Sequence, residues 1–149
     1  MYIARLVKFL ALTMCVAASA AEKPDSDKEK IKGSWQFVSS TEGGQETKLP
    51  SGMTVVITDS LLTTRRPGQD LVGGKYMLDP TQKPRQIDLS IEETRGHPIV
   101  QKGIYDLQGD TLRIHLAVAG QPRPTDFEAK AGDSGTVWVL KRVTYAAEK

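Results

Sequence analysis

Two histidines are the side chains of this sequence that most often bind metal ions or move protons near neutral pH. His97 lies between Gly96 and Pro98, and His115 lies in a run of alternating apolar and polar residues. Neither has a neighbour at the spacing of a metal site. The alternation places His115 on the solvated side of a strand. We therefore expect both histidines to be solvated surface residues, and we predict no metal site and no cofactor.

One serine lies in a run that is similar to the nucleophile loop of chymotrypsin-like serine proteases. The run is Gly-Asp-Ser-Gly, residues 132–135. A serine nucleophile of that kind also needs a histidine held by a carboxylate, and a fold of two barrels for which this chain is too short. We interpret the run as a glycine-rich turn before the last strand, and we predict that the protein is not an enzyme.

The clearest element of the sequence is a β-hairpin over residues 103–116, with its turn predicted at Gln108-Gly109. In that register Tyr105 faces Leu112 and Gly103 faces Ile114. Strand side chains alternate between two faces. One face of the hairpin is apolar, with Tyr105, Leu107, Leu112, Ile114 and Leu116. The other face is polar apart from Ile104, with Lys102, Asp106, Thr111, Arg113 and His115. The hairpin therefore belongs to an antiparallel sheet that covers a core.

Short alternating segments fill the rest of the mature chain, and turn residues separate them. The further predicted strands are residues 33–40, 53–58, 61–65, 74–78, 86–92, 126–130 and 136–143. Residues 68–75 depart from a phosphate-binding loop and are predicted as an ordinary loop. Strands at this spacing, without helical periodicity, predict an all-β fold. We expect an antiparallel up-and-down β-barrel of about eight strands, because sequential hairpins remove their edges by closing.

The first residues predict export. Residues 1–20 combine Arg5 and Lys8 with an apolar run and end in Ala-Ser-Ala, which is typical of a cleaved signal peptide. A lipoprotein with lipidated Cys15 is the minority alternative. Residues 21–32 are predicted as a polar tether with one short helical turn, residues 33–143 as the barrel domain, and residues 144–149 as a tail. We expect a periplasmic or extracellular protein.

Charge argues against two classes of partner. Without residues 1–20 the chain has 18 basic and 18 acidic residues. A neutral domain gives no reason to expect nucleic acid or an anionic membrane surface as a partner. The apolar run of the first residues is too short for a permanent anchor, so no stable membrane insertion is predicted after signal cleavage. The oligomeric state is left open.

A family resemblance adds to this interpretation. Gly33-Ser34-Trp35 near the start of the barrel, with Arg142 near its end, resembles the lipocalin arrangement. More closely, the chain is similar to a small uncharacterised lipocalin-like domain family found in planctomycete bacteria. The matching pieces are residues 33–35, 74–80, Pro84 with 87–89, 103–105, 109–112, 123–125 with Phe127, and 140–142. The resemblance implies a lipocalin-like barrel, often behind a signal peptide, in which Trp35 and Arg142 meet at the closed end. It implies no chemistry.

Two functions stay open at this point. The first is the binding of a small apolar or amphipathic molecule inside the barrel, lined by Tyr76, Tyr105, Leu112, Phe127 and Trp138. The second is a non-enzymatic interaction or scaffold domain of the cell envelope, whose barrel is filled by its own side chains. A barrel of about eight strands has room for side chains or one small ligand. An open apolar cavity would favour binding, and a packed interior would favour the scaffold.

Overall fold

The computed structural model describes residues 25–92 and 96–144. The predicted signal peptide and most of the predicted tail lie outside these ranges. The elements are α1 (Asp25–Ile31), β1 (Gly33–Glu42), β2 (Gln45–Glu46), β3 (Thr54–Ile57), β4 (Leu61–Arg66), β5 (Gln69–Asp79), β6 (Arg85–Ile91), β7 (Ile99–Gln108), β8 (Thr111–Leu116) and β9 (Thr136–Arg142). No helix among the described residues is long and apolar enough to cross a membrane.

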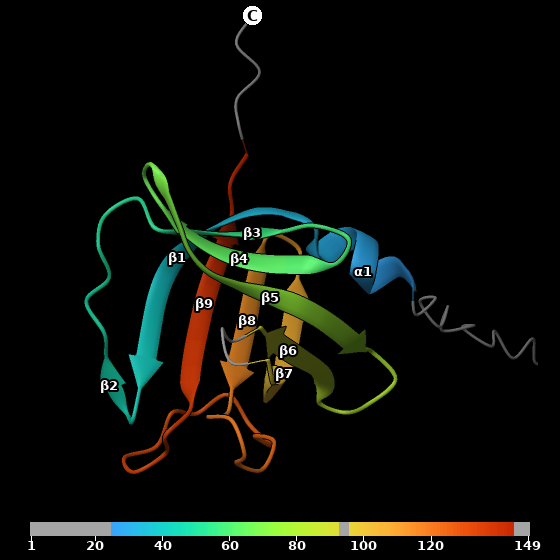
Figure 1. Cartoon of the computed structure of the whole chain (residues 1–149), viewed down its shortest axis with the longest axis vertical. Helices are drawn as coiled ribbons and strands as arrows, with labels where there is room; N and C mark the ends of the chain where they lie inside the picture. Colours follow the sequence, from blue (N-terminus) through green and yellow to red (C-terminus); the bar gives the residue numbers. More distant parts are fainter. Residues whose placement is uncertain (1–24, 93–95, 145–149) are drawn as a thin grey trace, which may run out of the picture.

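Eight of the nine strands form a closed antiparallel barrel. Strand order follows the sequence from β3 to β9, and β1 pairs with both β3 and β9. The short strand β2 pairs only with the end of β1. In Figure 1, β3, β4 and β5 cross in front of β1, β9 and β8 at a steep angle. The predicted all-β up-and-down barrel is confirmed.

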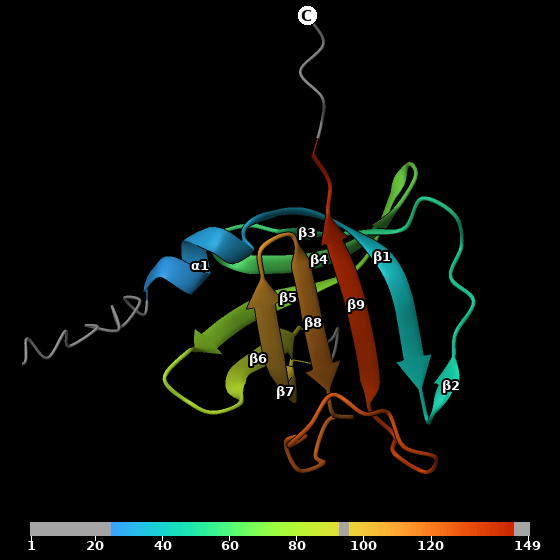
Figure 2. The same ribbon diagram turned by 180° about the vertical axis from the view of Figure 1, so that it is seen from behind.

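One end of the barrel is closed by α1. Ile31 is fully buried, and it belongs to the same apolar cluster as the barrel core. Figure 2 shows α1 at the upper end of β8, with the β8–β9 connection at the lower end. The core consists of Ile31, Trp35, Val55, Ile57, Leu62, Tyr76, Ile87, Leu89, Tyr105, Leu112, Ile114, Leu116 and Leu140. The helix therefore acts as a lid that completes the core.

The central hairpin has a different register from the one predicted. Its turn is Gly109-Asp110, so that Tyr105 faces Ile114 rather than Leu112. Gly109 has φ of +56°, a conformation that glycine adopts without steric cost and glutamine does not. When the turn moves by one residue, each residue of the first strand pairs with a residue two positions further along the second strand. Each side chain therefore keeps its predicted face, and Tyr105, Leu112 and Ile114 are all buried.

Two other predicted segments are wrong. The predicted loop 68–75 belongs mainly to β5, which pairs with β4 from Gln69 onward. The predicted strand 126–130 is absent, since the structure places no strand between Leu116 and Thr136. This long connection packs on the outside of the barrel, where it covers His115. His115 is 4% exposed, so its predicted solvation is wrong; His97 is exposed.

Candidate functional site at the barrel mouth

The closed end of the barrel is held by Trp35 and Arg142. The two residues face each other across β1 and β9, and the Arg142 guanidinium carbon lies 4.2 Å from the centre of the indole ring. Arg142 also donates hydrogen bonds to the carbonyls of Lys30 and Lys32, at 2.9 Å for Lys32. The Trp35 Nε1–H donates to the carbonyl of Ile31 at 2.8 Å. Both side chains therefore serve to join α1 to the barrel.

A charged network reinforces this closure. Asp27 on α1 is 5% exposed, and its carboxylate accepts hydrogen bonds from the Tyr105 hydroxyl at 2.7 Å and from Arg85 at 2.9 Å. Arg85 also pairs with Asp106 at 3.2 Å. Burial and the neighbouring Asp27 carboxylate raise the pKa of the Tyr105 phenol well above its usual value. The network therefore ties Asp27 on α1 to β6 and β7, and Asp27 and Arg85 also line a cavity of about 400 Å³ at this end of the barrel.

Three of the five residues predicted to line a ligand cavity are packed into the core. Tyr76, Tyr105 and Leu112 are 6%, 1% and 0% exposed. The Tyr76 hydroxyl donates to the carbonyl of Thr58 at 2.7 Å, and Tyr105 is bonded to Asp27. Five cavities of about 320–450 Å³ lie along the described residues, and none of the five is lined by these side chains. The barrel interior is filled where we expected a ligand.

The other two residues predicted to line the cavity, Phe127 and Trp138, are not buried in the core with these three. Phe127 belongs to the β8–β9 connection, and its ring packs against Arg113, with 4.6 Å between the guanidinium carbon and the ring centre. Arg113 points outward, because its neighbours Leu112 and Ile114 are buried inside the barrel. The predicted inward position of Phe127 is therefore wrong. Trp138 faces inward opposite Ile114 and stays partly exposed at the open end.

Partly exposed apolar side chains surround that open end, which we call the mouth. Phe37 meets Trp138 edge to face, with ring centres 5.5 Å apart and an interplanar angle of 80°. Elsewhere on the barrel Val72 pairs with Thr64, and Ile91 pairs with Ile99. Val72 is 53% exposed. The mouth is therefore apolar and accessible, unlike the filled interior behind it.

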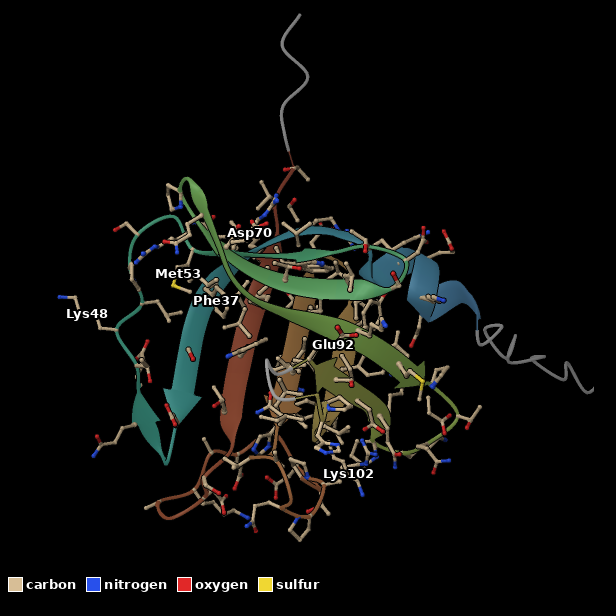
Figure 3. All side chains as sticks on the ribbon, in the orientation of Figure 1. Phe37, Lys48, Met53, Asp70, Glu92 and Lys102 are labelled. Carbon is tan, nitrogen blue, oxygen red and sulfur yellow. The ribbon has the colours of Figure 1, made fainter. Side chains whose placement is uncertain are left out.

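A groove adjoins the mouth where β1 and β3 separate. Their pairing ends at Gln36 and Thr54, and β1 is then displaced by an irregularity between Phe37 and Ser39. Residues 46–53 pass along the gap and leave a groove of about 450 Å³. Figure 3 shows Phe37 and Met53 side by side in this region, while Lys48 points away from the barrel. Phe37 thus contributes both to the groove and to the mouth.

Apolar and polar side chains share the groove. Its apolar lining is Phe37, Val38, Leu49, Pro50 and Met53, and its polar lining includes Glu46 and Lys48. The groove could not be predicted from the sequence, because it depends on the β1 irregularity and on a segment without regular structure. The exposed Val38, at 62%, is the one local signal, since an apolar residue there breaks the alternation of β1.

The described residues contain no group of three or more histidine, cysteine or acidic side chains placed to hold a metal ion. No protein-family model, no curated protein and no solved structure matches the chain.

Proposed function

We propose that this chain is an exported, lipocalin-like domain without enzymatic activity, and that it binds the apolar part of a small amphipathic molecule at its mouth. The contact between Phe37 and Trp138 carries this proposal, because it leaves two aromatic rings partly exposed beside an open groove. Aromatic side chains supply large apolar contact areas at binding sites. The proposal that the domain is lipocalin-like rests on the sequence motifs. The closed barrel and the contact between Trp35 and Arg142 support it.

The filled interior sets where such a ligand lies. Ile114 and Leu116 are buried, and neither lines any of the five cavities described above. The apolar part would therefore rest on Phe37 and Trp138 and extend into the groove beside Met53. Glu46 and Lys48 line the same groove, so a polar group of the ligand would lie near charged side chains. This division of the lining favours an amphipathic ligand over a purely apolar one.

A second candidate is an interaction domain that uses exposed apolar side chains on the surface of the barrel. Val38, Leu71 and Val72 are 62%, 37% and 53% exposed, and apolar groups of this kind also occur in protein interfaces. The packed interior is the observation that favours this candidate. It differs from the first in its partner, which would be a protein surface rather than a small molecule.

The two tryptophans of the chain give a direct test. Trp138 lies at the mouth, whereas Trp35 is fully buried at the closed end. In Trp35→Phe all indole fluorescence comes from Trp138, and in Trp138→Phe it comes from Trp35. We expect dodecanoate to shift the emission of Trp35→Phe and to leave that of Trp138→Phe unchanged, with circular dichroism verifying the fold of both.

Mutations in the groove complete the experiment. Phe37→Ala in the Trp35→Phe background is expected to weaken the dodecanoate response. The control Val118→Ala removes an exposed apolar side chain that does not line the groove, and it is expected to leave the dodecanoate response unchanged. A response from Trp35 alone, or none from Trp138, would contradict binding at the mouth and favour the interaction domain.

A further inference from the structure

A second pocket lies on the outer wall of the barrel, beneath the β8–β9 connection. His115 on β8 is paired with Ile104 on β7 and with Val137 on β9, and all three are buried. The side chains of this row point outward, so the connection that covers them buries them. Two of the three are aliphatic, as expected for a small apolar layer. The imidazole is the exception that calls for an explanation.

One hydrogen bond determines which nitrogen of the His115 ring carries the proton. His115 Nδ1 lies 2.7 Å from the carbonyl oxygen of Asp126. A carbonyl only accepts, so Nδ1 carries the proton and Nε2 of the neutral ring is an acceptor. Within residues 25–92 and 96–144 no group donates a hydrogen bond to Nε2. Nε2 is not among the buried polar atoms that lack a partner, so this acceptor is open to a molecule that enters from outside.

The surroundings keep Nε2 accessible. A Cβ on Gly135 would lie 2.9 Å from Nε2, so glycine at this position leaves the nitrogen uncovered. His115 and Gly135 both line a pocket of about 400 Å³. Ser134 lines it as well, although no hydrogen bond in the described structure joins Ser134 to His115. The Gly-Asp-Ser-Gly run thus forms one wall of this pocket.

Charge in the pocket is balanced. Arg123 and Lys130 line it together with Asp126 and Asp133. Arg123 is paired with Asp88 at 2.7 Å, and Lys130 with Asp126 at 3.2 Å. A pocket with equal numbers of cations and carboxylates favours neither an anion nor a cation. Hydroxyl groups suit it, because each hydroxyl both donates and accepts and therefore matches the Nε2 acceptor and the neighbouring donors.

We propose that this pocket is a separate binding site for a small, neutral, polyhydroxylated molecule of the saccharide class, with one hydroxyl donating to His115 Nε2. The remaining polar side chains of the lining, Gln121, Thr125 and Ser134, supply further hydrogen-bonding groups for such a ligand. The volume falls within the range of small-molecule pockets. The site is independent of the mouth and does not depend on the function proposed there.

The imidazole signals in nuclear magnetic resonance test this assignment on the full chain. The sequence has two histidines, and the exposed His97 serves as an internal control for His115. Glucose, N-acetylglucosamine and cellobiose are titrated separately into the ¹⁵N-labelled protein. We expect at least one of them to shift the His115 Nε2 resonance in a saturable way, with His97 unchanged.

Two variants separate a binding site from a merely structural histidine. Gly135→Ala keeps the His115 side chain, but its methyl group would meet Nε2 at 2.9 Å and the Leu116 carbonyl oxygen at 2.8 Å, so the local structure must shift. We expect it to weaken saccharide binding at least about tenfold, which corresponds to losing one hydrogen bond. His115→Phe should abolish binding, measured by calorimetry, and the matched control His97→Phe should bind like the parent.

Three results would overturn the proposal. The first is a His115 resonance that no saccharide moves at millimolar concentrations. The second is a response to inorganic phosphate or ethanolamine without one to saccharides, which would assign a charged ligand. The third is undiminished binding in a folded Gly135→Ala protein, which would place the saccharide away from Nε2.

Discussion

The hydroxyl of Tyr105 on β7 donates a 2.7 Å hydrogen bond to the carboxylate of Asp27 on α1, and both side chains are buried. Hydrogen bonds to charged groups contribute about 1.5–3 kcal/mol to stability. We expect Tyr105→Phe to lower the free energy of unfolding by that amount in urea denaturation. Tyr76→Phe is the matched control. It loses a bond to a neutral carbonyl, so its expected cost is about 0.5–1.5 kcal/mol. Equal losses in the two variants would contradict a special role for Asp27.

Alkaline pH should destabilise the fold through the same tyrosine. Burial and Asp27 raise the pKa of Tyr105 in the folded protein, while an unfolded tyrosine has a pKa of about 10. Below pH 10 the phenol is protonated in both states, and its contribution to stability is constant. Above about pH 10 only the unfolded chain releases the proton, so the free energy of unfolding falls as pH rises. Urea denaturation between pH 8 and pH 12 (about two units on either side of the tyrosine pKa) should show a shallower decline in Tyr105→Phe than in the parent.

The Trp35–Arg142 contact should be a large source of stability. Trp35→Ala removes a fully buried side chain and is expected to cost about 3–5 kcal/mol. Arg142→Lys keeps the charge but loses the planar contact with the indole, for which about 0.5–2 kcal/mol is expected. Thermal unfolding of both variants measures these losses. If Trp35→Ala melted like the parent, this end of the barrel would not contribute to stability as described.

Affinity at the mouth should be modest. A shallow site formed by Phe37 and Trp138 buries less of a ligand than an enclosed cavity does. We expect dissociation constants for dodecanoate in the micromolar range or weaker, about −8 kcal/mol at best. Isothermal titration calorimetry measures this value. Nanomolar affinity would require an interior that opens far beyond the packed arrangement.

The N-terminus of the exported protein should be Ala21. The prediction follows from the charged start, the apolar run and the Ala-Ser-Ala sequence that ends at Ala20. N-terminal sequencing of protein recovered from the cell envelope or medium checks it. A lipid on Cys15, or an intact Met1, would show that the segment is processed differently.

Alternation along the chain was sufficient to predict the barrel and the inward faces of its strands. It placed Trp35 and Arg142 together, because an up-and-down barrel must pair its first strand with its last. It could not fix the turn of the central hairpin. Gln108-Gly109 and Gly109-Asp110 are both plausible two-residue turns by composition, and both leave every side chain on the same face.

The functional surfaces were harder to predict, because they depend on segments that lie outside the strand pattern. His115 has a polar position in its strand, and only the connection after β8 turns that position into a buried one. Phe127 was assigned to a strand that does not form. The groove beside Phe37 arises where two strands separate, and alternation carries no information about such a gap.

The pairing of β1 with β9 also has a consequence for the order of folding. Every other strand pair of the barrel joins strands that follow one another in the sequence. Most of these pairs close only short loops, and the exception is the pair of β8 and β9, which a long connection joins. Closure of β1 onto β9 brings Trp35 to Arg142 across nearly the whole domain. Non-local pairing of this kind slows folding. A chain still lacking residues 136–142 would expose the unpaired edges of β1 and β8, so the last strand decides whether the nascent protein is a barrel or an open sheet able to pair with other chains.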